Sequence, residues 1–292
     1  MTVALYCRSI AEADLPVVQR MLELLQHRKF RIFLHKRFYE CVSAAVTLPA
    51  GTQVFTTHAE ISEHADYLFS LGGDGTLLDT LTLVRDRPIP VAGINLGRLG
   101  FLANIGKDEI EATIDALLEG TYVLDRRALL ELVTNRPVFD GVNFALNDIT
   151  LHKKDTSNMI LIHTYLNGQF LNSYFADGLI VATPTGSTGY SLSCGGPIVM
   201  PDSGNIILTP IAPHNLNVRP MVLSEDSVLS FEVEGRSREF YCTLDSRTET
   251  LDASFQIAVK KCGFTMKLIR LRDHHFLDTL RRKLMWGADI RR

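Results

Sequence analysis

The chain has 292 residues, a formal net charge of −3 at neutral pH, 46% hydrophobic residues and 22% charged residues. This length predicts two domains, and the composition is that of a folded globular protein rather than a disordered one. With 30 Lys and Arg against 33 Asp and Glu, the chain lacks the overall positive charge that a nucleic-acid partner would favour.

Cysteine usage and the N-terminus indicate the compartment. The five cysteines are widely scattered, and neither they nor the nine histidines show the spacing of metal ligands. No basic segment precedes an apolar run at the N-terminus, and no stretch reaches ~18 uninterrupted apolar residues. We therefore expect a cytoplasmic protein with reduced cysteines, neither secreted nor membrane-spanning, and we assign no residue to a protein-held metal ion.

Residues 1–125 alternate short apolar runs with segments of helical periodicity. The predicted strands are Val3–Tyr6, Arg31–Leu34, Tyr67–Leu71 and Val91–Asn95. The predicted helices are Leu15–Leu25, a helix that follows the glycines after Leu71 and runs through Val84, and Asp108–Leu118. This alternation predicts an α/β domain with a parallel sheet covered on both faces, whose ligand sites lie at the carboxyl ends of the strands.

After this domain the pattern changes to short strand-like runs with few helices. The predicted strands are Leu130–Thr134, Ile149–His152, Met159–Leu166, Gly178–Ala182, Ile206–Leu208, Val228–Val233, Phe240–Leu244, Phe255–Val259 and Thr265–Ile269. We expect a second, β-rich domain over residues 126–270. The last segment, His274–Arg292, places apolar residues among Arg281, Arg282 and Lys283 and predicts an amphipathic helix.

The sharpest motif is the glycine loop, Gly72-Gly73-Asp74-Gly75-Thr76, which lies between a predicted buried strand and a predicted helix. Backbone N–H groups at a helix N-terminus can bind phosphate oxygens, and glycines let the ligand approach closely. The loop carries no lysine, so it is not a Walker loop. Among phosphates, Asp74 would hold Mg²⁺ or accept a proton from an attacking hydroxyl; alternatively, it only forms the turn or caps the helix.

Two further motifs carry polar groups in the β-rich half. In the segment Asp177–Ser191, a hydrophobic strand runs into Thr183-Pro184-Thr185-Gly186-Ser187-Thr188, where hydroxyl groups converge. This hydroxyl loop can bind ribose, amide or phosphate groups, or it can be a polar surface loop with Ser/Thr turns. The pair Asn147-Asp148 can recognise an adenine edge and ribose hydroxyls, although Asn-Asp is also a common turn pair.

In their order and spacing, these motifs resemble those of the NAD kinases. The resemblance rests on Gly72–Thr76, Asn95–Leu102, Asn147-Asp148, Asp177-Gly178 and Thr183–Ser191, and it continues to Leu280–Leu284. It implies an α/β N-terminal domain for nucleotide and phosphate binding, a β-sandwich-like C-terminal domain, and a final segment, 271–292, that returns to the first domain.

The resemblance also implies an activity. It is transfer of a phosphoryl group from ATP, with Mg²⁺ or another divalent cation, to the 2′-hydroxyl of the adenosine ribose of NAD, giving NADP. In this family NAD lies in the cleft between the domains and across a subunit interface. The C-terminal domain is therefore implied to bind NAD and to form a homodimer or homotetramer.

Carried over residue by residue, the resemblance assigns Asp74 to activate the 2′-hydroxyl, while Gly73 and Gly75 keep the phosphate path clear. Asn147 and Asp148 would hold adenine and ribose. The adenosine side is implied to include Thr188, Tyr190 and Asp245, the nicotinamide side Asp177, Thr185, Ser193 and Ala212, and the binding set is completed by Thr76 and Arg98.

Two departures and three rival functions accompany this assignment. Gly189 stands where the family usually has Ala, and Ser246 follows Asp245 where a Gly or His is often found.

A diacylglycerol-type lipid kinase has a similar glycine loop, but the Thr-Pro-Thr-Gly-Ser-Thr stretch distinguishes this chain from it. A non-catalytic dinucleotide sensor would not need Asp74, and an oxidoreductase would show Gly-x-Gly-x-x-Gly after Val3–Tyr6.

Overall fold

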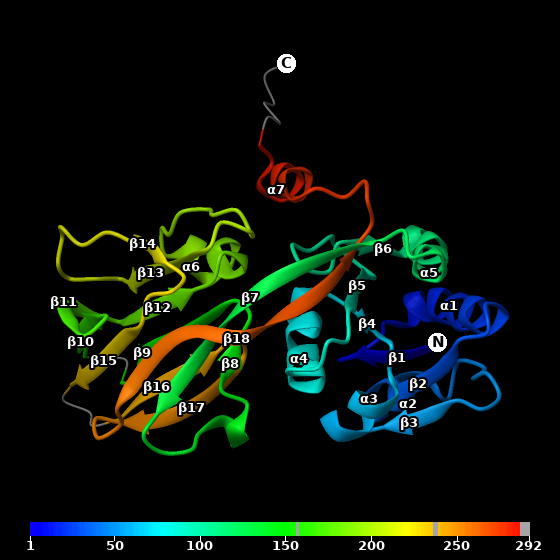
Figure 1. Ribbon diagram of the computed structural model, residues 1–292, viewed down its shortest axis with the longest axis horizontal. Helices are drawn as coiled ribbons and strands as arrows, with labels where there is room; N and C mark the ends of the chain where they lie inside the picture. Colours follow the sequence, from blue (N-terminus) through cyan, green and yellow to red (C-terminus); the bar gives the residue numbers. More distant parts are fainter. Residues whose placement is uncertain (156–157, 236–238, 287–292) are drawn as a thin grey trace. The chain divides into compact units, whose positions relative to one another are not determined.

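The computed structural model describes residues 1–155, 158–235 and 239–286, and the chain divides into two compact units. The first unit comprises Met1–Arg126 and Met266–Arg292, and the second comprises Arg127–Thr265 (Figure 1). Strands β7 (Val123–Thr134) and β18 (Ile257–Arg270) each contribute residues to both units. The two units are described separately below.

The first unit is built on a parallel sheet. Its strands are β1 (Thr2–Cys7), β2 (Arg31–His35), β3 (Gln53–Phe55), β4 (Tyr67–Leu71), β5 (Val91–Asn95) and β6 (Ile105–Gly106). The order is β3-β2-β1-β4-β5, with β6 and the end of β18 both pairing with β5, and every pair is parallel. The predicted parallel sheet is confirmed, and the carboxyl ends of β1, β4 and β5 share one edge.

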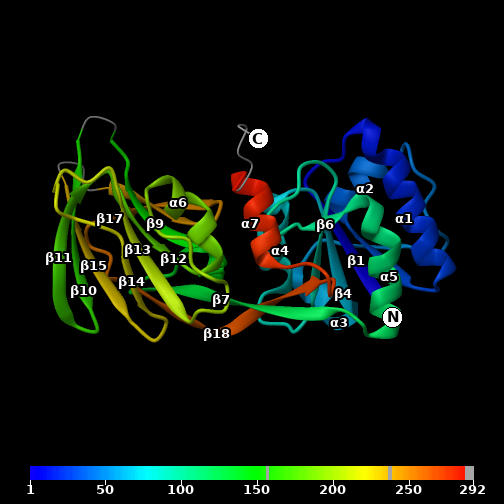
Figure 2. The same cartoon turned by 90° about the horizontal axis from the view of Figure 1, so that it is seen from above.

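Helices cover both faces of this sheet. They are α1 (Leu15–His27), α2 (Lys36–Val42), α3 (His58–His64), α4 (Asp74–Val84) and α5 (Ile110–Glu119), with short 3-10 turns at Glu12–Asp14 and Lys107–Glu109. Helix α7 (Phe276–Leu284) belongs to the same unit. Helices α1 and α5 lie on one side of β1 and β4, and α4 lies on the other (Figure 2).

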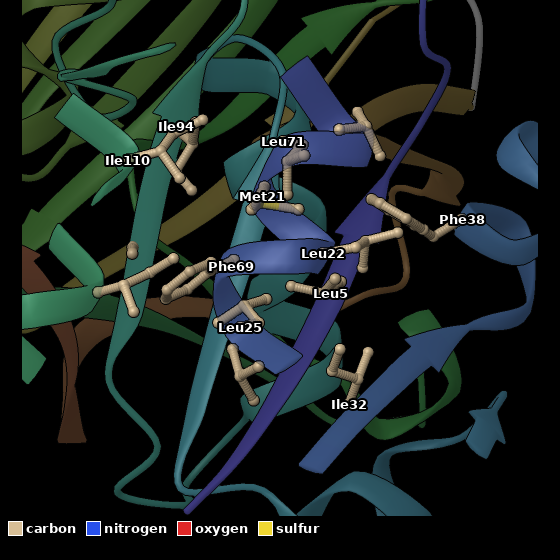
Figure 3. Packing of buried hydrophobic residues seen from close by; sticks show 14 of the residues in the cluster. Leu5, Met21, Leu22, Leu25, Ile32, Phe38, Phe69, Leu71, Ile94 and Ile110 are labelled. Carbon is tan, nitrogen blue, oxygen red and sulfur yellow. The ribbon is translucent and has the colours of Figure 1, made fainter. Parts of the chain in front are cut away.

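Alternation along the strands explains the core beneath α1. Leu5 and Phe69 point to the same face and pack with Met21 and Leu22 of α1 and Ile110 of α5, all nearly inaccessible to solvent (Figure 3). Each such side chain contributes about 1.5–3 kcal/mol of hydrophobic free energy on burial. This core fixes β1 and β4 relative to each other, and hence the loops that follow them.

The second unit is a β-sandwich of antiparallel strands. Its strands are β8 (Phe144–Ala145), β9 (Asp148–Lys153), β10 (Ile160–Leu166), β11 (Gln169–Ala176), β12 (Gly178–Ala182), β13 (Asn205–Ile211), β14 (Met221–Ser224), β15 (Leu229–Glu234), β16 (Glu239–Leu244) and β17 (Arg247–Asp252), and its helical turns are Phe139–Gly141, Thr185–Thr188 and α6 (Tyr190–Ser193).

One sheet runs β11-β10-β15-β18, with β7 beside β18 and β8 beside β7, and the other runs β14-β13-β12-β9-β16-β17. Ile162 and Phe231 from the first sheet share one buried core with Leu151 and Val181 from the second. The predicted α/β domain and β-rich second domain are therefore both confirmed as a fold class.

The structure corrects some predicted elements. Phe255–Val259 and Thr265–Ile269, predicted as two strands, belong largely to the single strand β18, which continues through Gly263 without a turn. The predicted terminal helix is confirmed as α7, whereas residues 287–292 of that prediction lie outside the described residues. Within the described part of the chain, no helix is long and apolar enough to cross a membrane.

Candidate functional site

The glycine loop joins β4 to α4 at the carboxyl edge of the first unit's sheet. Gly72 has φ +145°, and a Cβ there would lie 2.5 Å from Oγ1 of Thr76, so this position requires glycine. Gly73 is the N-cap of α4, and the N–H groups of Thr76 and Leu77 donate to its carbonyl. The first N–H groups of α4 lack partners within the helix, and their dipoles favour an anion at this end.

Asp74 is the first residue of α4, and its carboxylate is held by backbone amides of a neighbouring loop. Oδ2 accepts from the N–H of Phe101 at 2.8 Å, and Oδ1 accepts from those of Leu102 at 3.0 Å and Ala103 at 2.8 Å. Asp74 is half-buried. Asp74 therefore connects the start of α4 to the loop after β5, and its side chain does not cap α4.

The loop that holds Asp74 follows β5 and takes its shape from Asn95. Oδ1 of Asn95 accepts from the N–H of Gly97 at 2.7 Å, and its Nδ2 donates to the carbonyl of Arg98 at 2.6 Å. Gly100 packs directly on Asp74, because a Cβ at this position would overlap Oδ1 of the carboxylate. The side chain of Arg98, predicted to bind ligand, is exposed on this loop.

Helix α7 packs beside the same loop within the first unit. The rings of Phe101 and Phe276 lie 6.3 Å apart, and Nζ of Lys283 lies 5.8 Å from the centre of the Phe101 ring. A pocket of 350 Å³ is lined by the Asn95–Leu99 side of the loop and by residues of α7, including Arg282. The basic face of the terminal helix thus borders the loop that orients Asp74.

In the second unit, the structure brings together two motifs that are distant in the sequence. Thr183 donates from Oγ1 to the carbonyl of Leu146 at 2.6 Å and from its N–H to the carbonyl of Asn147 at 2.9 Å. Gly186 lies so close to Asn147 that a Cβ there would overlap the Asn147 carbonyl oxygen. The hydroxyl loop and the Asn147-Asp148 pair are therefore one structural cluster.

Asp245 belongs to this cluster. It forms a two-residue hairpin turn with Ser246 between β16 and β17, with φ +54°. Its carboxylate accepts from the N–H groups of Leu146 at 2.9 Å, Asn147 at 2.7 Å and Asp148 at 3.3 Å. Burial raises the pKa of Asp245, and these amide bonds oppose that shift. Its carboxylate is directed at the backbone that presents Asn147 and Asp148.

Asp148 is a buried carboxyl, 7% exposed, at the start of β9. Its Oδ1 accepts from Oγ1 of Thr150 at 3.0 Å. Burial, followed by the negative charge of Asp245, raises the pKa of Asp148 to about 7, although the bond from Thr150 lowers it. Asp148 can therefore be a hydrogen-bond donor as well as an acceptor near neutral pH.

The remaining predicted residues differ in how accessible they are. Thr185 is buried, and its hydroxyl accepts from Nη1 of Arg127 at 3.2 Å, whereas Tyr190 is 43% exposed. The pKa of Tyr190 is raised by burial, then by Cys194 and, to a smaller degree, by the charges of Asp148 and Asp177, which places it within range of both carboxyls. Thr188 is half-buried, and Ser193 is exposed.

Asp177 and Ala212 lie at the same end of one strand pair. The N–H of Asp177 donates to the carbonyl of Ile211 at 3.0 Å, and Oδ1 of Asp177 lies 2.6 Å from Nζ of Lys153. Ala212 is exposed and follows Ile211 with φ +43°, a strained value for a residue other than glycine. Asp177 and Ala212, two of the four residues predicted for the nicotinamide side, are thus neighbours.

Two arginines near these clusters were missed by the sequence analysis. Arg8 follows β1 directly, beside the glycine loop, and a basic residue at the carboxyl end of a parallel strand was a usable signal. Arg127 is 6% exposed within β7, where the local sequence pattern does not indicate that its side chain reaches Thr185.

A carboxylate held at a helix N-terminus that is suited to bind an anion, in an α/β unit joined to a β-sandwich, fits a phosphotransferase of the small-molecule kinase class. Comparison with known families is specific. The ATP-NAD kinase N-terminal domain matches residues 3–122, and the ATP-NAD kinase C-terminal domain matches residues 146–271. The chain belongs to the ATP-NAD kinase family.

Similar proteins agree with this placement. The chain is 46% identical over 292 residues to the NAD kinase of Cytophaga hutchinsonii, covering all of both chains, and 47% identical over 231 residues to that of Porphyromonas gingivalis, covering 79% and 80%. A crystal structure of yeast NADH kinase with NADH shares the fold, with a TM-score of 0.91 at 23% identity, covering 100% of this chain and 89% of that one. An Archaeoglobus fulgidus NAD kinase solved with ATP has a TM-score of 0.76 at 25% identity, covering 98% and 99%.

Proposed function

We propose that this chain transfers the γ-phosphoryl group of ATP to the 2′-hydroxyl of the adenosine ribose of NAD, giving NADP and ADP. The observation that carries the proposal is the Asp74 carboxylate, fixed by three amides at the start of the glycine loop's helix. Full-length relatives are NAD kinases, and structural neighbours were solved with NADH and with ATP, which supports both substrates.

Asp74 would act as the general base. A sugar hydroxyl is too weak an acid to ionise at neutral pH, so its proton leaves late, as the oxygen bonds to phosphorus and the bond to the ADP oxygen breaks. The three amide bonds use three of the roughly four acceptor positions of a carboxylate. The remaining position, on Oδ2, is where the 2′-hydroxyl would donate.

The glycine loop would bind the donor phosphates. Charge on the transferring group is spread over its oxygens, so catalysis needs alignment and charge neutralisation more than covalent help. Gly73 suits this role, because a Cβ there would have no heavy atom within 4 Å and the loop surface stays open. Mg²⁺ would arrive as part of the ATP complex, neutralising charge on the phosphates, and we assign no residue of the chain as its ligand.

The cluster in the second unit would bind the dinucleotide. Asn147 and Asp148 would hold adenine and ribose, with Thr188 and Tyr190 beside them. Asp245 would act through Asn147 and Asp148, because its carboxylate accepts hydrogen bonds from their backbone N–H groups. Asp177, Thr185, Ser193 and Ala212 would serve the nicotinamide half, and Thr76 and Arg98 the phosphates.

Assembly and compartment complete the proposal. We propose a homodimer or homotetramer that works in the cytoplasm, and the five free cysteines are compatible with a reducing compartment. The oligomer can be measured by sedimentation, where a species of twice or four times 32.6 kDa supports it and a monomer contradicts it.

A coupled assay tests the activity. The protein is mixed with NAD, ATP and Mg²⁺, and NADP is detected with an NADP-specific dehydrogenase. We expect NADP to form only when all three are present, and replacing ATP by polyphosphate or NAD by NADH defines the range of donor and acceptor. Absence of NADP, or transfer of label from γ-labelled ATP to diacylglycerol instead, would contradict the proposal.

A further inference from the structure

Arg8 lies against the glycine loop without being part of it. Strands β1 and β4 pair in parallel, with Cys7 opposite Leu71, so the residues that follow both strands lie at the same edge of the sheet. A Cβ built on Gly75 would lie 3.2 Å from Nη1 of Arg8 and 3.8 Å from its Cζ. The guanidinium is therefore a direct neighbour of the second residue of α4.

Asp79 fixes the orientation of this guanidinium. Nε and Nη2 of Arg8 donate to the two carboxylate oxygens of Asp79, which lies five residues after Asp74 on α4. The hydroxyl of Tyr6 donates to Oδ2 of Asp79 at 2.8 Å. The bond to Asp79 raises the pKa of Arg8, and burial, followed by Asp79, raises the pKa of Tyr6 to about 12, so both groups remain donors.

This arrangement directs one edge of the guanidinium to the loop. The pair with Asp79 uses Nε and Nη2, whereas Nη1 is the nitrogen nearest Gly75. The Arg8 side chain is 43% exposed and that of Asp79 is 22% exposed, so the pair is reachable from solvent. A planar, pre-oriented guanidinium is well suited to phosphate oxygens, because little rotational freedom is left to lose on binding.

We propose that Arg8 binds the phosphate chain of the phosphoryl donor through its Nη1 edge, and that Asp79 and Tyr6 position it. This inference rests on the proposed function and adds a residue to it. Arg8 stabilises negative charge on the donor phosphates next to the helix N-terminus, where charge shifts toward the leaving group during transfer. A lysine cannot replace it fully, because one ammonium cannot both pair with Asp79 bidentately and face Gly75.

The test separates donor binding from acceptor binding. In Arg8→Met we expect the KM for ATP to rise roughly 10- to 100-fold, the loss expected for one charged hydrogen bond, with the KM for NAD within about twofold. Arg8→Lys should lie between Arg8→Met and the parent protein. Inorganic tripolyphosphate should compete with ATP less well in Arg8→Met than in the parent protein.

Arg28→Met is the matched control. Arg28, which follows α1, pairs with both oxygens of Asp115 on α5, at 2.7 and 3.1 Å, so this variant loses an equivalent ion pair in the same unit. We expect it to keep the parental KM for ATP. An equal rise in both variants, or a rise in the KM for NAD alone, would overturn the proposal.

A binding measurement keeps the inference separate from the reaction. Calorimetric titration of a non-hydrolysable ATP analogue should show weaker binding to Arg8→Met than to the parent protein, whether or not NAD is the acceptor. Lack of NADP in the coupled assay contradicts the proposed function, whereas equal analogue affinity contradicts the role of Arg8. If Arg8→Met does not fold, Arg8→Lys supplies the same comparison.

Discussion

Each of the two units contains an aspartate whose carboxylate accepts three backbone hydrogen bonds, but the two aspartates lie in different surroundings. Asp74 in the first unit accepts from Phe101, Leu102 and Ala103 and is half-buried at a helix N-terminus. Asp245 in the second unit accepts from three consecutive amides that end at Asp148, and burial raises its pKa.

The comparison shows that one bonding pattern can serve two purposes. At Asp74, the amides fix a half-buried carboxylate beside the glycine loop. At Asp245, the carboxylate fixes the amides, because they are the backbone N–H groups of Asn147 and Asp148, whose side chains are predicted to bind ligand. We therefore expect substitutions at Asp74 to change turnover, and substitutions at Asp245 to change stability and NAD affinity.

The largest effect is expected from Asp74→Asn. The amide cannot accept the proton, and general-base catalysis contributes about 10²–10⁴-fold. The NH₂ group of Asn would also replace one carboxylate oxygen. It would then face either the N–H of Phe101 or the N–H groups of Leu102 and Ala103, which are all donors and cannot bond to it. We expect turnover to fall by at least this factor while NAD still binds, measured by NADP formation and by calorimetric titration. Parental turnover in this variant would refute the assignment of Asp74 as base.

A smaller effect on turnover is expected from Gly100→Ala, which keeps the Asp74 carboxylate but moves it from its position. The added Cβ would overlap Oδ1 of Asp74, and misplacing a reacting group by about 1 Å can cost about 10²-fold. We expect kcat to fall roughly 10- to 100-fold. Gly97→Ala, in the same loop, is the control, since its Cβ would lie 3.9 Å from the nearest atom, Oδ1 of Asn95. Equal kcat values for the two variants would show that the carboxylate position does not limit the reaction.

Asp245→Asn tests whether the second aspartate stabilises the protein through its amide bonds. An Asn side chain has one acceptor oxygen, so at least one amide among residues 146–148 would face its NH₂ group. An unsatisfied buried donor costs about 1–3 kcal/mol, and we expect the free energy of unfolding to fall by this amount in urea titrations, with a higher KM for NAD. Asp252→Asn on β17, at an exposed carboxylate that accepts from Ser254 and pairs with Arg136, should change stability by less than about 1 kcal/mol. Parental stability of Asp245→Asn would mean that its amide bonds do not hold the cluster.

Periodicity in the sequence predicts most of the fold but fails where elements are short or continuous. Apolar runs predict β1, β4 and β5, because buried strands of a parallel sheet need apolar residues on both faces. Helix α3 was missed although its capping box, Thr57 with Glu60, was a readable signal. The sequence analysis divided strand β18 in two, whereas the strand runs through Gly263 without a turn.

The candidate site was predictable as a set of motifs but not as a set of contacts. The glycine loop and Asp74 follow from the local sequence, yet the bonds to Phe101–Ala103 depend on how the loop after β5 folds back. The hydroxyl loop seemed rich in ligand donors, but Thr183 and Ser187 donate to backbone carbonyls of the protein itself. Such pairings arise from tertiary packing, which no local pattern encodes.

The last prediction concerns the pH dependence of stability that Asp148 causes. Its pKa is about 7 in the folded chain because of burial and the charge of Asp245, against about 3.9 for an unfolded aspartate. The folded state therefore binds more protons than the unfolded state between these values. The free energy of unfolding should fall as the pH rises from about 4 to about 7 and level off above, by on the order of 2–4 kcal/mol.

Asp148→Asn removes this titration, so the free energy of unfolding should fall less with pH in the variant. The variant should therefore gain stability relative to the parent protein as the pH increases toward 8. Urea titrations at pH 5, 6, 7 and 8 measure the difference. Asp252→Asn again serves as the control, because the bonds from Ser254 hold the pKa of Asp252 below its usual value and its titration lies at lower pH. If the slopes of Asp148→Asn and the parent protein coincide, the charge of Asp148 does not destabilise the folded chain, and the prediction is wrong.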